Sequence, residues 1–110
     1  MSAEFAGTLG ERILIERPVA ERNELGLQEY GWEIVCRCRA SVTLEGVGPE
    51  AEAMALSAMP RFRVTIRKRD GIAIDQRVSW KDKMMMIRQF LDDPKAPDRI
   101  SLRCEEVRSP

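Results

Sequence analysis

The stretch WEIVCRCRASVTL, from Trp32 to Leu44, decides the fold class of this chain because its side chains alternate between apolar and polar. Successive side chains of a β-strand point to opposite faces, so the even-numbered residues share one face and the odd-numbered residues share the other. The stretch therefore predicts one long strand with one face in a core and the other in water or at an interface. The residues expected in the core are Trp32, Ile34, Cys36, Cys38, Ala40, Val42 and Leu44.

Other segments repeat this period of two, and turn signals separate them. We expect Pro18 to end the first of them, because proline cannot donate to a strand ladder. Residues 77–80 and 84–90 predict a hairpin that turns around residues 81–83. The chain is therefore predicted to be mainly all-β, a small antiparallel β-barrel or sandwich of about six strands. These segments are residues 12–17, 61–67, 77–80, 84–90 and 100–104.

The connections divide the chain further. Residues 21–30 contain Asn23 and Gly26 and predict a long hairpin loop. Residues 46–60 break the period of two, and they predict a short helix or long loop inserted between the second and third strands. At 110 residues the chain is predicted to be a single domain, residues 1–110, with an N-terminal arm at residues 1–9.

Composition and charge exclude several classes of protein. The sequence is 44% hydrophobic and 33% charged, and it lacks the run of about 20 apolar residues that a membrane-spanning helix needs. Its first residues lack the basic and apolar parts of a signal peptide, so we expect a cytoplasmic protein that does not enter a membrane. Residues 1–60 hold five basic and ten acidic residues (net −5), and residues 61–110 hold thirteen and eight (net +5). This polarity suits a protein that docks to a complementary surface, including that of a second copy.

The sequence offers little for catalysis or metal binding. It contains no histidine, the usual general base and metal ligand, so no catalytic residue, metal site or cofactor is predicted. Cys36 and Cys38 are too close in sequence for a typical zinc pair, and we expect core packing for them. In the run Met84 to Met86, the core is expected on one face and exposure at an interface for Met85.

Basic side chains gather on the polar faces of two predicted strands. One interpretation is a solvated face balanced by acids, and the other is a face that contacts neighbouring subunits or phosphates. Aromatic residues that could stack on bases are almost missing from this face, which weakens a role in reading nucleic acid. The candidate subunit-contact residues are Arg37, Arg39, Arg61, Arg63 and Arg67, with Glu16, Glu21, Glu24 and Glu29 as possible acidic counterparts.

The order of the segments resembles that of the bacteriophage head–tail joining family, also called head-completion or stopper proteins. The similarity runs from Gly10 to Glu106. It begins with an opening strand that ends in Arg17-Pro18 and continues with a polar loop leading to Trp32. The most characteristic segment is Arg63-Val64-Thr65-Ile66-Arg67 leading to Gly71-Ile72. The remaining matches are Ala40-Ser41-Val42, Arg77-Val78 with Met86-Ile87, and the closing Leu102-Arg103-Cys104-Glu105.

The resemblance implies a structural protein of tailed phages, prophages or gene transfer agents. Copies would assemble in the bacterial cytoplasm into a ring, expected to hold six, that joins the portal and adaptor complex to the tail terminator or tail tube proteins in the virion or phage-like particle. The ring would continue the channel close to packaged DNA. The alternatives are a tail terminator or other minor connector protein and a small nucleic-acid-binding barrel. The resemblance places the channel loop at residues 46–60, with Gly46, Gly48, Glu50, Glu52, Met54 and Met59 as its candidate residues.

Overall fold

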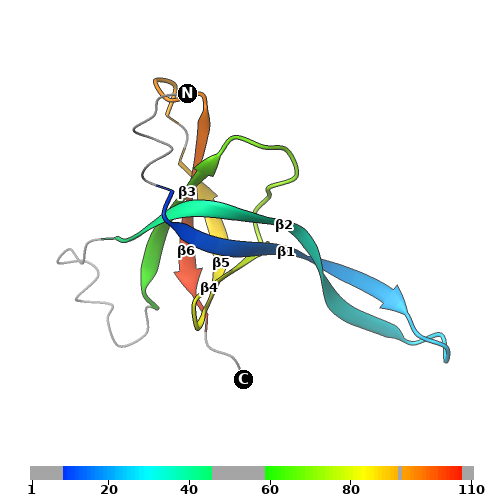
Figure 1. Cartoon of the computed structure of the whole chain (residues 1–110). Coiled ribbons are helices and arrows are strands. Elements are labelled where there is room, and N and C mark those ends of the chain that lie inside the picture. Colours follow the sequence, from blue (N-terminus) through cyan, green and yellow to red (C-terminus); the bar gives the residue numbers. More distant parts are fainter. Residues whose placement is uncertain (1–8, 46–58, 92, 108–110) are drawn as a thin grey trace.

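The computed structural model describes residues 9–45, 59–91 and 93–107, and these form six antiparallel strands and no helix. Figure 1 shows the strands curling into a barrel, from which β1 and β2 extend together to one side. The strand order is β1-β2-β3-β6-β5-β4, and β4 pairs with β1 to close the barrel. The predicted all-β class is confirmed, and the architecture is a barrel rather than a sandwich. The strands are β1 (Glu11–Arg22), β2 (Gln28–Leu44), β3 (Arg61–Arg67), β4 (Arg77–Trp80), β5 (Lys83–Phe90) and β6 (Arg99–Glu106).

The core fills the barrel with one side chain from every second position of each strand. On β3, the buried residues are Phe62, Val64 and Ile66, as the alternation predicts. On β6, Leu102 and Cys104 are fully buried. A domain of this size gains most of its stability from such burial, at about 25 cal/mol per Å² of apolar surface removed from water. The other members of the core cluster are Ile13, Ile15, Cys36, Ala40, Val78, Met85 and Ile87.

The methionine run places its middle residue inside the barrel. Met85 is completely buried, and the interface exposure expected for it is wrong. Its cross-strand partner is Val78, which is also completely buried, and Ile87 continues the same face two residues later. The core face of β5 is therefore the odd-numbered one, and Met84 and Met86 lie partly exposed on the outside.

The first strand does not end at Pro18. Strand β1 continues to Arg22 and pairs with β2 along its whole length. Its pairing with β4 covers only Leu14 to Glu16, so beyond Glu16 one edge of β1 is free among the described residues. Proline is tolerated at an edge because no ladder hydrogen bond is needed there. The expected loop over residues 21–30 is correspondingly shorter, because only residues 23–27 separate the two strands.

A β-bulge reverses the faces of the ribbon that β1 and β2 form beyond the barrel. Ile15 pairs with Cys36, but the next residue, Glu16, pairs with Ile34, so Val35 is an extra residue on β2. An extra residue moves the side chains of one strand to the opposite face relative to its partner. Ile34 and the residues before it therefore share the face of Glu16, and the burial expected for Trp32 and Ile34 is wrong: they are 38% and 47% exposed.

The opposite end of β2 departs from the expected core as well. Leu44 is 60% exposed and the prediction of its burial is wrong, because the strand reaches the barrel rim there. Cys38 and Val42 are partly buried against the core. The predicted short helix and most of the 46–60 insertion lie outside the described residues, as does the N-terminal arm apart from Leu9. Within the described part of the chain, no helix could span a bilayer.

Candidate functional site

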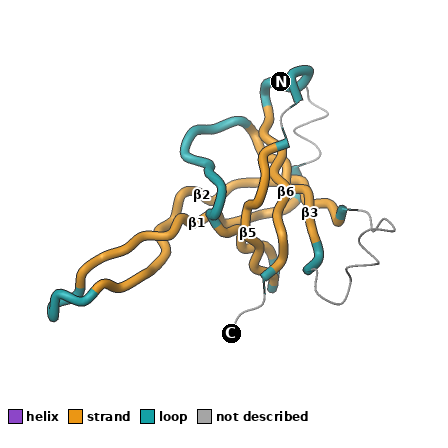
Figure 2. Tube along the Cα trace, turned by 180° about the vertical axis from the view of Figure 1, so that it is seen from behind, coloured by secondary structure: helices purple, strands orange, loops and turns teal. Residues whose placement is uncertain are grey.

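The β1–β2 ribbon projects from the barrel as an arm, which we define as residues 16–34. Figures 1 and 2 show it from two sides as an extended pair of strands whose tip lies far from the barrel. Cross-strand partners lie on the same face of a ribbon, so the pairing register assigns each side chain to a face. The first face is mostly apolar: Pro18 pairs with Trp32, Ala20 with Tyr30, and Ile34 lies at its base.

The opposite face of the arm is polar and acidic. Glu21 pairs directly with Glu29, an arrangement of like charges that is unfavourable without a counter-charge. Arg17 pairs with Glu33 and forms an exposed ion pair of 3.0 Å with it. Over residues 16–34 the arm carries five acidic and two basic residues, a net charge of −3. The ribbon therefore presents an apolar surface and an acidic surface on opposite sides.

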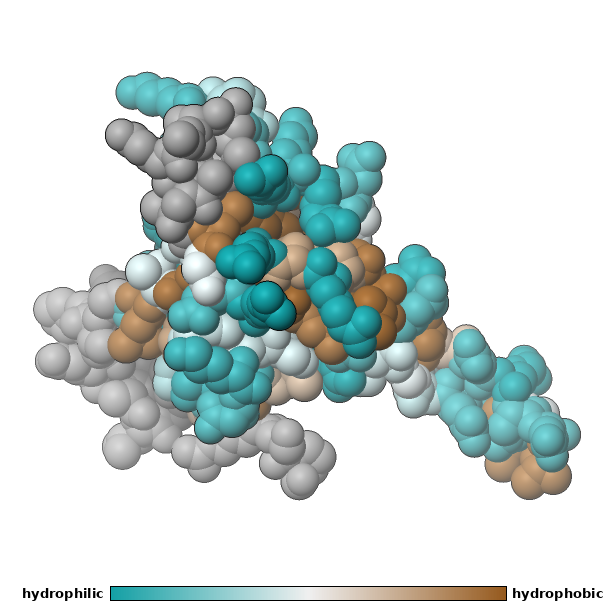
Figure 3. Space-filling model, viewed as in Figure 1, coloured by the Kyte–Doolittle hydropathy of each residue, from teal (hydrophilic) through white to brown (hydrophobic). Residues whose placement is uncertain are grey.

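The tip of the arm is a turn with a defined hydrogen-bond pattern. The Asn23 side-chain Oδ1 accepts hydrogen bonds from the backbone N–H groups of Leu25 (2.9 Å) and Leu27 (3.0 Å). Gly26 adopts a φ of +77°, in the left-handed region that glycine enters at little cost. This turn holds two apolar side chains outward, with Leu25 82% exposed and Leu27 61% exposed. Figure 3 shows the resulting apolar patch at the end of the arm.

At its base, the arm is fixed to the barrel by Arg77 of β4. The Arg77 guanidinium donates a hydrogen bond of 2.8 Å from Nε to the Glu16 carboxylate. The same guanidinium lies over the Trp32 ring, 4.2 Å from its centroid. One arginine thus binds both strands of the arm at the point where they leave the barrel.

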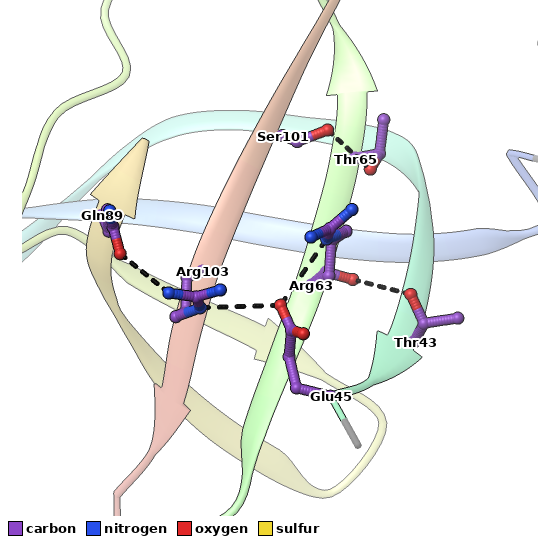
Figure 4. A network of polar contacts seen from close by, with 7 residues as sticks. All are labelled: Thr43, Glu45, Arg63, Thr65, Gln89, Ser101 and Arg103. Carbon is purple, nitrogen blue, oxygen red and sulfur yellow. Dashed lines mark hydrogen bonds and ion pairs between the residues drawn. The ribbon is translucent and has the colours of Figure 1, made fainter. Parts of the chain in front are cut away.

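The five predicted contact arginines are all exposed, but the structure divides them into two groups. Arg61 and Arg63 have acidic partners within the chain, Glu105 at 3.9 Å and Glu45 at 3.5 Å. Figure 4 shows Glu45 between Arg63 and Arg103. The Glu45 carboxylate Oε1 lies 3.6 Å from Arg103 Nε. Arg61 and Arg63 therefore have counter-charges within their own chain.

The second group has no acidic partner among the described residues. It comprises Arg37, Arg39 and Arg67. Arg39 pairs across the strands with Arg12, and Arg67 pairs with Arg99, so like charges lie side by side on the outside of β1, β2, β3 and β6. This surface has an excess of positive charge and suits an acidic partner.

A pocket of about 270 Å³ opens beside these arginines. Its apolar walls come from Leu9, Ile66 and Cys38, and its polar walls come from Arg39, Arg67 and Arg69. Burial and the neighbouring Cys36 raise the pKa of the Cys38 thiol to about 11, although Arg69 acts to lower it. Cys38 is therefore protonated near neutral pH, and the pocket is apolar inside with a cationic rim.

The cysteines otherwise behave as core residues. All three are free; Cys36 is buried as expected, and Cys104 is buried as well. Burial raises the pKa of Cys104 to about 12, which leaves it an unreactive thiol near neutral pH. No group of three or more potential metal ligands occurs in the described part of the chain.

The family description of the phage head completion protein matches residues 6–107, nearly the whole chain. The chain belongs to this family. A head completion protein is a virion-associated structural protein that acts in the head–tail connector and interacts with other head and tail proteins. The family is known as structural and non-enzymatic.

A solved structure supports the fold of this head completion protein. Protein SF1141 from Shigella flexneri 2a, whose solution structure is known, shares 26% sequence identity with this chain. The two structures match with a TM-score of 0.69. The similarity covers 91% of this chain and 94% of that one. No curated protein matches the chain by sequence.

The structure describes only some of the predicted site residues of this head completion protein. Among the channel-loop candidates, Gly46, Gly48, Glu50, Glu52 and Met54 lie outside the described residues, and Met59 is partly exposed just before Pro60. Their role stays a prediction, as does that of the contact arginines. Sequence reasoning missed the arm as a surface, although Tyr30 continues the alternation of Trp32 and Ile34 and could have extended the strand.

Proposed function

We propose that this head completion protein is the stopper of the head–tail connector. Copies of the chain form a ring beneath the portal and adaptor, the ring continues the DNA channel, and the tail docks on its other side. The family supports a connector role, and the earlier resemblance supports the specific position. The residues of the 46–60 insertion are the part of the chain that we assign to the channel.

The observation that carries the proposal is the projecting arm. A two-stranded ribbon alone is marginally stable in water, and stability usually needs a third strand or packing against another element. The arm exposes Tyr30 at 78%, together with Trp32 and Ile34, on one face. Exposed apolar surface that is contiguous and has a polar rim is typical of protein interfaces. The arm is therefore suited to be ordered against neighbouring proteins of the particle.

The charge distribution supports the same role. The acidic arm and the unpaired arginines lie on different parts of the chain, so one copy can offer each to a different neighbour. A ring requires such heterologous contacts, in which two different surfaces of the same protein meet.

A matched pair of variants tests the role of the arm in particles. Ile34 and Ile74 are similarly exposed, at 47% and 43%, but only Ile34 lies on the arm. We expect Ile34→Ser to yield heads that lose their tails or leak DNA, as heads without the protein would, while Ile74→Ser yields complete particles. The assay counts tailed and DNA-filled particles by electron microscopy. Equal particle counts for the two variants would contradict a docking role for the arm.

Cross-linking in particles then tests the position in the connector. A stopper contacts both the adaptor and a tail protein, whereas a tail terminator contacts only tail proteins and other terminator copies. We expect lysine-reactive cross-links from the barrel to both neighbours. Cross-links to tail proteins alone would assign the protein to the terminator position instead.

A further inference from the structure

Two features of this chain, the leucine tip of the arm and the arginine-rimmed pocket, have no counterpart among the residues that the structure describes. The tip presents Leu25 and Leu27 to solvent, at 82% and 61% exposure. The pocket has apolar walls and a volume of about 270 Å³. An exposed apolar side chain and an apolar pocket of suitable size are complementary, because burying one in the other removes both from water.

The charges around the two features are also complementary. The strands and turn at the tip carry Glu21, Glu24 and Glu29 against one arginine, Arg22. The pocket rim carries Arg39, Arg67 and Arg69, and none of these has an acidic partner among the described residues. An acidic tip that enters this pocket would give the rim the counter-charge that the described residues of its own chain do not supply. Complementary charge of this kind also fixes the register of a contact.

One chain cannot bring its own tip and pocket together. The pocket lies where β1 begins, at Leu9, whereas the tip lies where β1 ends, after Arg22. At roughly 3.3 Å per residue, about 45 Å of strand separates them. The strand is held extended by its pairing with β2 along its length, so the tip cannot fold back. The pocket of one chain can therefore receive only the tip of another.

We propose that the tip of the arm, Glu24 to Leu27, docks into the pocket of the next copy of the chain. Leu25 enters between Leu9 and Ile66, and Glu24 lies against the arginine rim. Because the tip and the pocket are different surfaces, each copy can receive one neighbour and enter the next in a head-to-tail series, which closes into a ring when the rotation between copies divides a full turn. This inference rests on the proposed function, since it specifies the contact between subunits of the connector ring.

The native thiol in the pocket provides a direct test. In a Leu25→Cys variant, the new thiol of one copy would lie beside Cys38 of the next. Particles that carry the variant are oxidised with copper(II) phenanthroline, which takes two electrons from two thiols and leaves one disulfide. Because burial slows the reaction of Cys38, the oxidation is followed over hours and compared with a Leu25→Cys/Cys38→Ser control. We expect a ladder of dimers, trimers and larger multimers that is absent from the control.

The outcomes distinguish a failure of the tip-to-pocket contact from a failure of the connector function. A ladder that stops at the dimer would contradict the head-to-tail contact, because a reciprocal pair cannot extend. A variant that is present in particles but forms no adduct, or forms one with a different particle protein, would overturn the tip-to-pocket contact and leave the connector function intact. Absence of the wild-type protein from the head–tail junction would overturn the connector function itself.

A charge exchange gives a second measurement that does not depend on thiol chemistry. Glu24→Arg and Arg67→Glu each place like charges at the proposed contact, and we expect each to lower incorporation into particles at least tenfold. The double variant restores opposite charges and should recover most of the incorporation. If the double variant is no better than the single ones, the two residues do not meet.

Discussion

Replacing Arg77 by alanine should destabilise this protein far more than replacing Arg17, although both arginines form short ion pairs with a glutamate. Arg77 contacts Glu16 at 2.8 Å, with side chains only 25% and 14% exposed. Arg17 contacts Glu33 at 3.0 Å, with side chains 56% and 54% exposed. The distances are nearly equal, so the two ion pairs differ mainly in burial, and Arg77 has in addition its contact with the Trp32 ring.

The expected magnitude follows from what each side chain loses. A hydrogen bond to a charged group contributes about 1.5–3 kcal/mol when its partner would be left partly buried and unpaired. The position of Arg77 over the Trp32 ring adds about 0.5–1 kcal/mol at a partly exposed site. We therefore expect Arg77→Ala to lower the free energy of unfolding by about 2–4 kcal/mol. For Arg17→Ala, screening by solvent leaves about 0–1 kcal/mol.

Urea unfolding followed by tryptophan fluorescence measures both values. A double-mutant cycle with Glu16→Gln should give a coupling energy of at least about 1 kcal/mol for the Arg77 pair. The same cycle for Arg17 and Glu33 should give less than about 0.5 kcal/mol. Equal destabilisation by the two alanine variants, or equal coupling in the two cycles, would refute the argument that burial makes the Arg77 contact the attachment of the arm.

Three further predictions test single features of the fold. Burial raises the pKa of Cys38 from 9.0 to about 11 and that of Cys104 to about 12, so above pH 9 the folded chain keeps protons that the unfolded chain releases. The free energy of unfolding should therefore fall as pH rises from 9 toward 12. In the Cys104→Ala variant it should fall less steeply than in the wild-type protein, and equal slopes in the two proteins would exclude Cys104 as a cause. Gly26→Ala should lower the free energy of unfolding in urea by about 1–2 kcal/mol, because residue 26 has a φ of +77°. The control Gly10→Ala, whose added Cβ would meet nothing within 4 Å, should lower it by less than about 0.5 kcal/mol. Equal losses in the two variants would contradict backbone strain at residue 26. Met85→Ala should cost about 2–5 kcal/mol because the side chain is completely buried, and a cost below 1 kcal/mol would contradict its place in the core.

Most of the strand content could be predicted because alternation is a local property of the sequence. On β3, the three residues Phe62, Val64 and Ile66 alternate with polar ones in a segment that has no bulge, and all three are buried. The methionine run is ambiguous for the same local reason, since all three side chains are equally apolar. The register of the β4–β5 hairpin, which pairs Met85 with the buried Val78, decides that Met85 faces inward.

The arm could not be predicted because it depends on a single extra residue. Val35 continues the apolar pattern of its neighbours, and nothing in its side chain indicates a bulge. The pairing of Glu16 with Ile34 shows the bulge only in three dimensions. The same holds for the arginines: their exposure follows from alternation, but whether one has an acidic partner depends on residues such as Glu45, which follows the end of a different strand.

The edges of the arm also determine how it can dock. Beyond Glu16, both outer edges of the ribbon lack a paired strand among the described residues, and a free edge invites the addition of another strand. Pro18 removes one backbone donor, the bulge at Val35 twists the base, and the Glu21–Glu29 pair places two like charges near the end. These are the features by which proteins prevent edge-to-edge pairing. Because strand addition is disfavoured, the arm is left with its apolar face and its leucine tip as the means of contact, and both of these select a partner by side chains rather than by backbone.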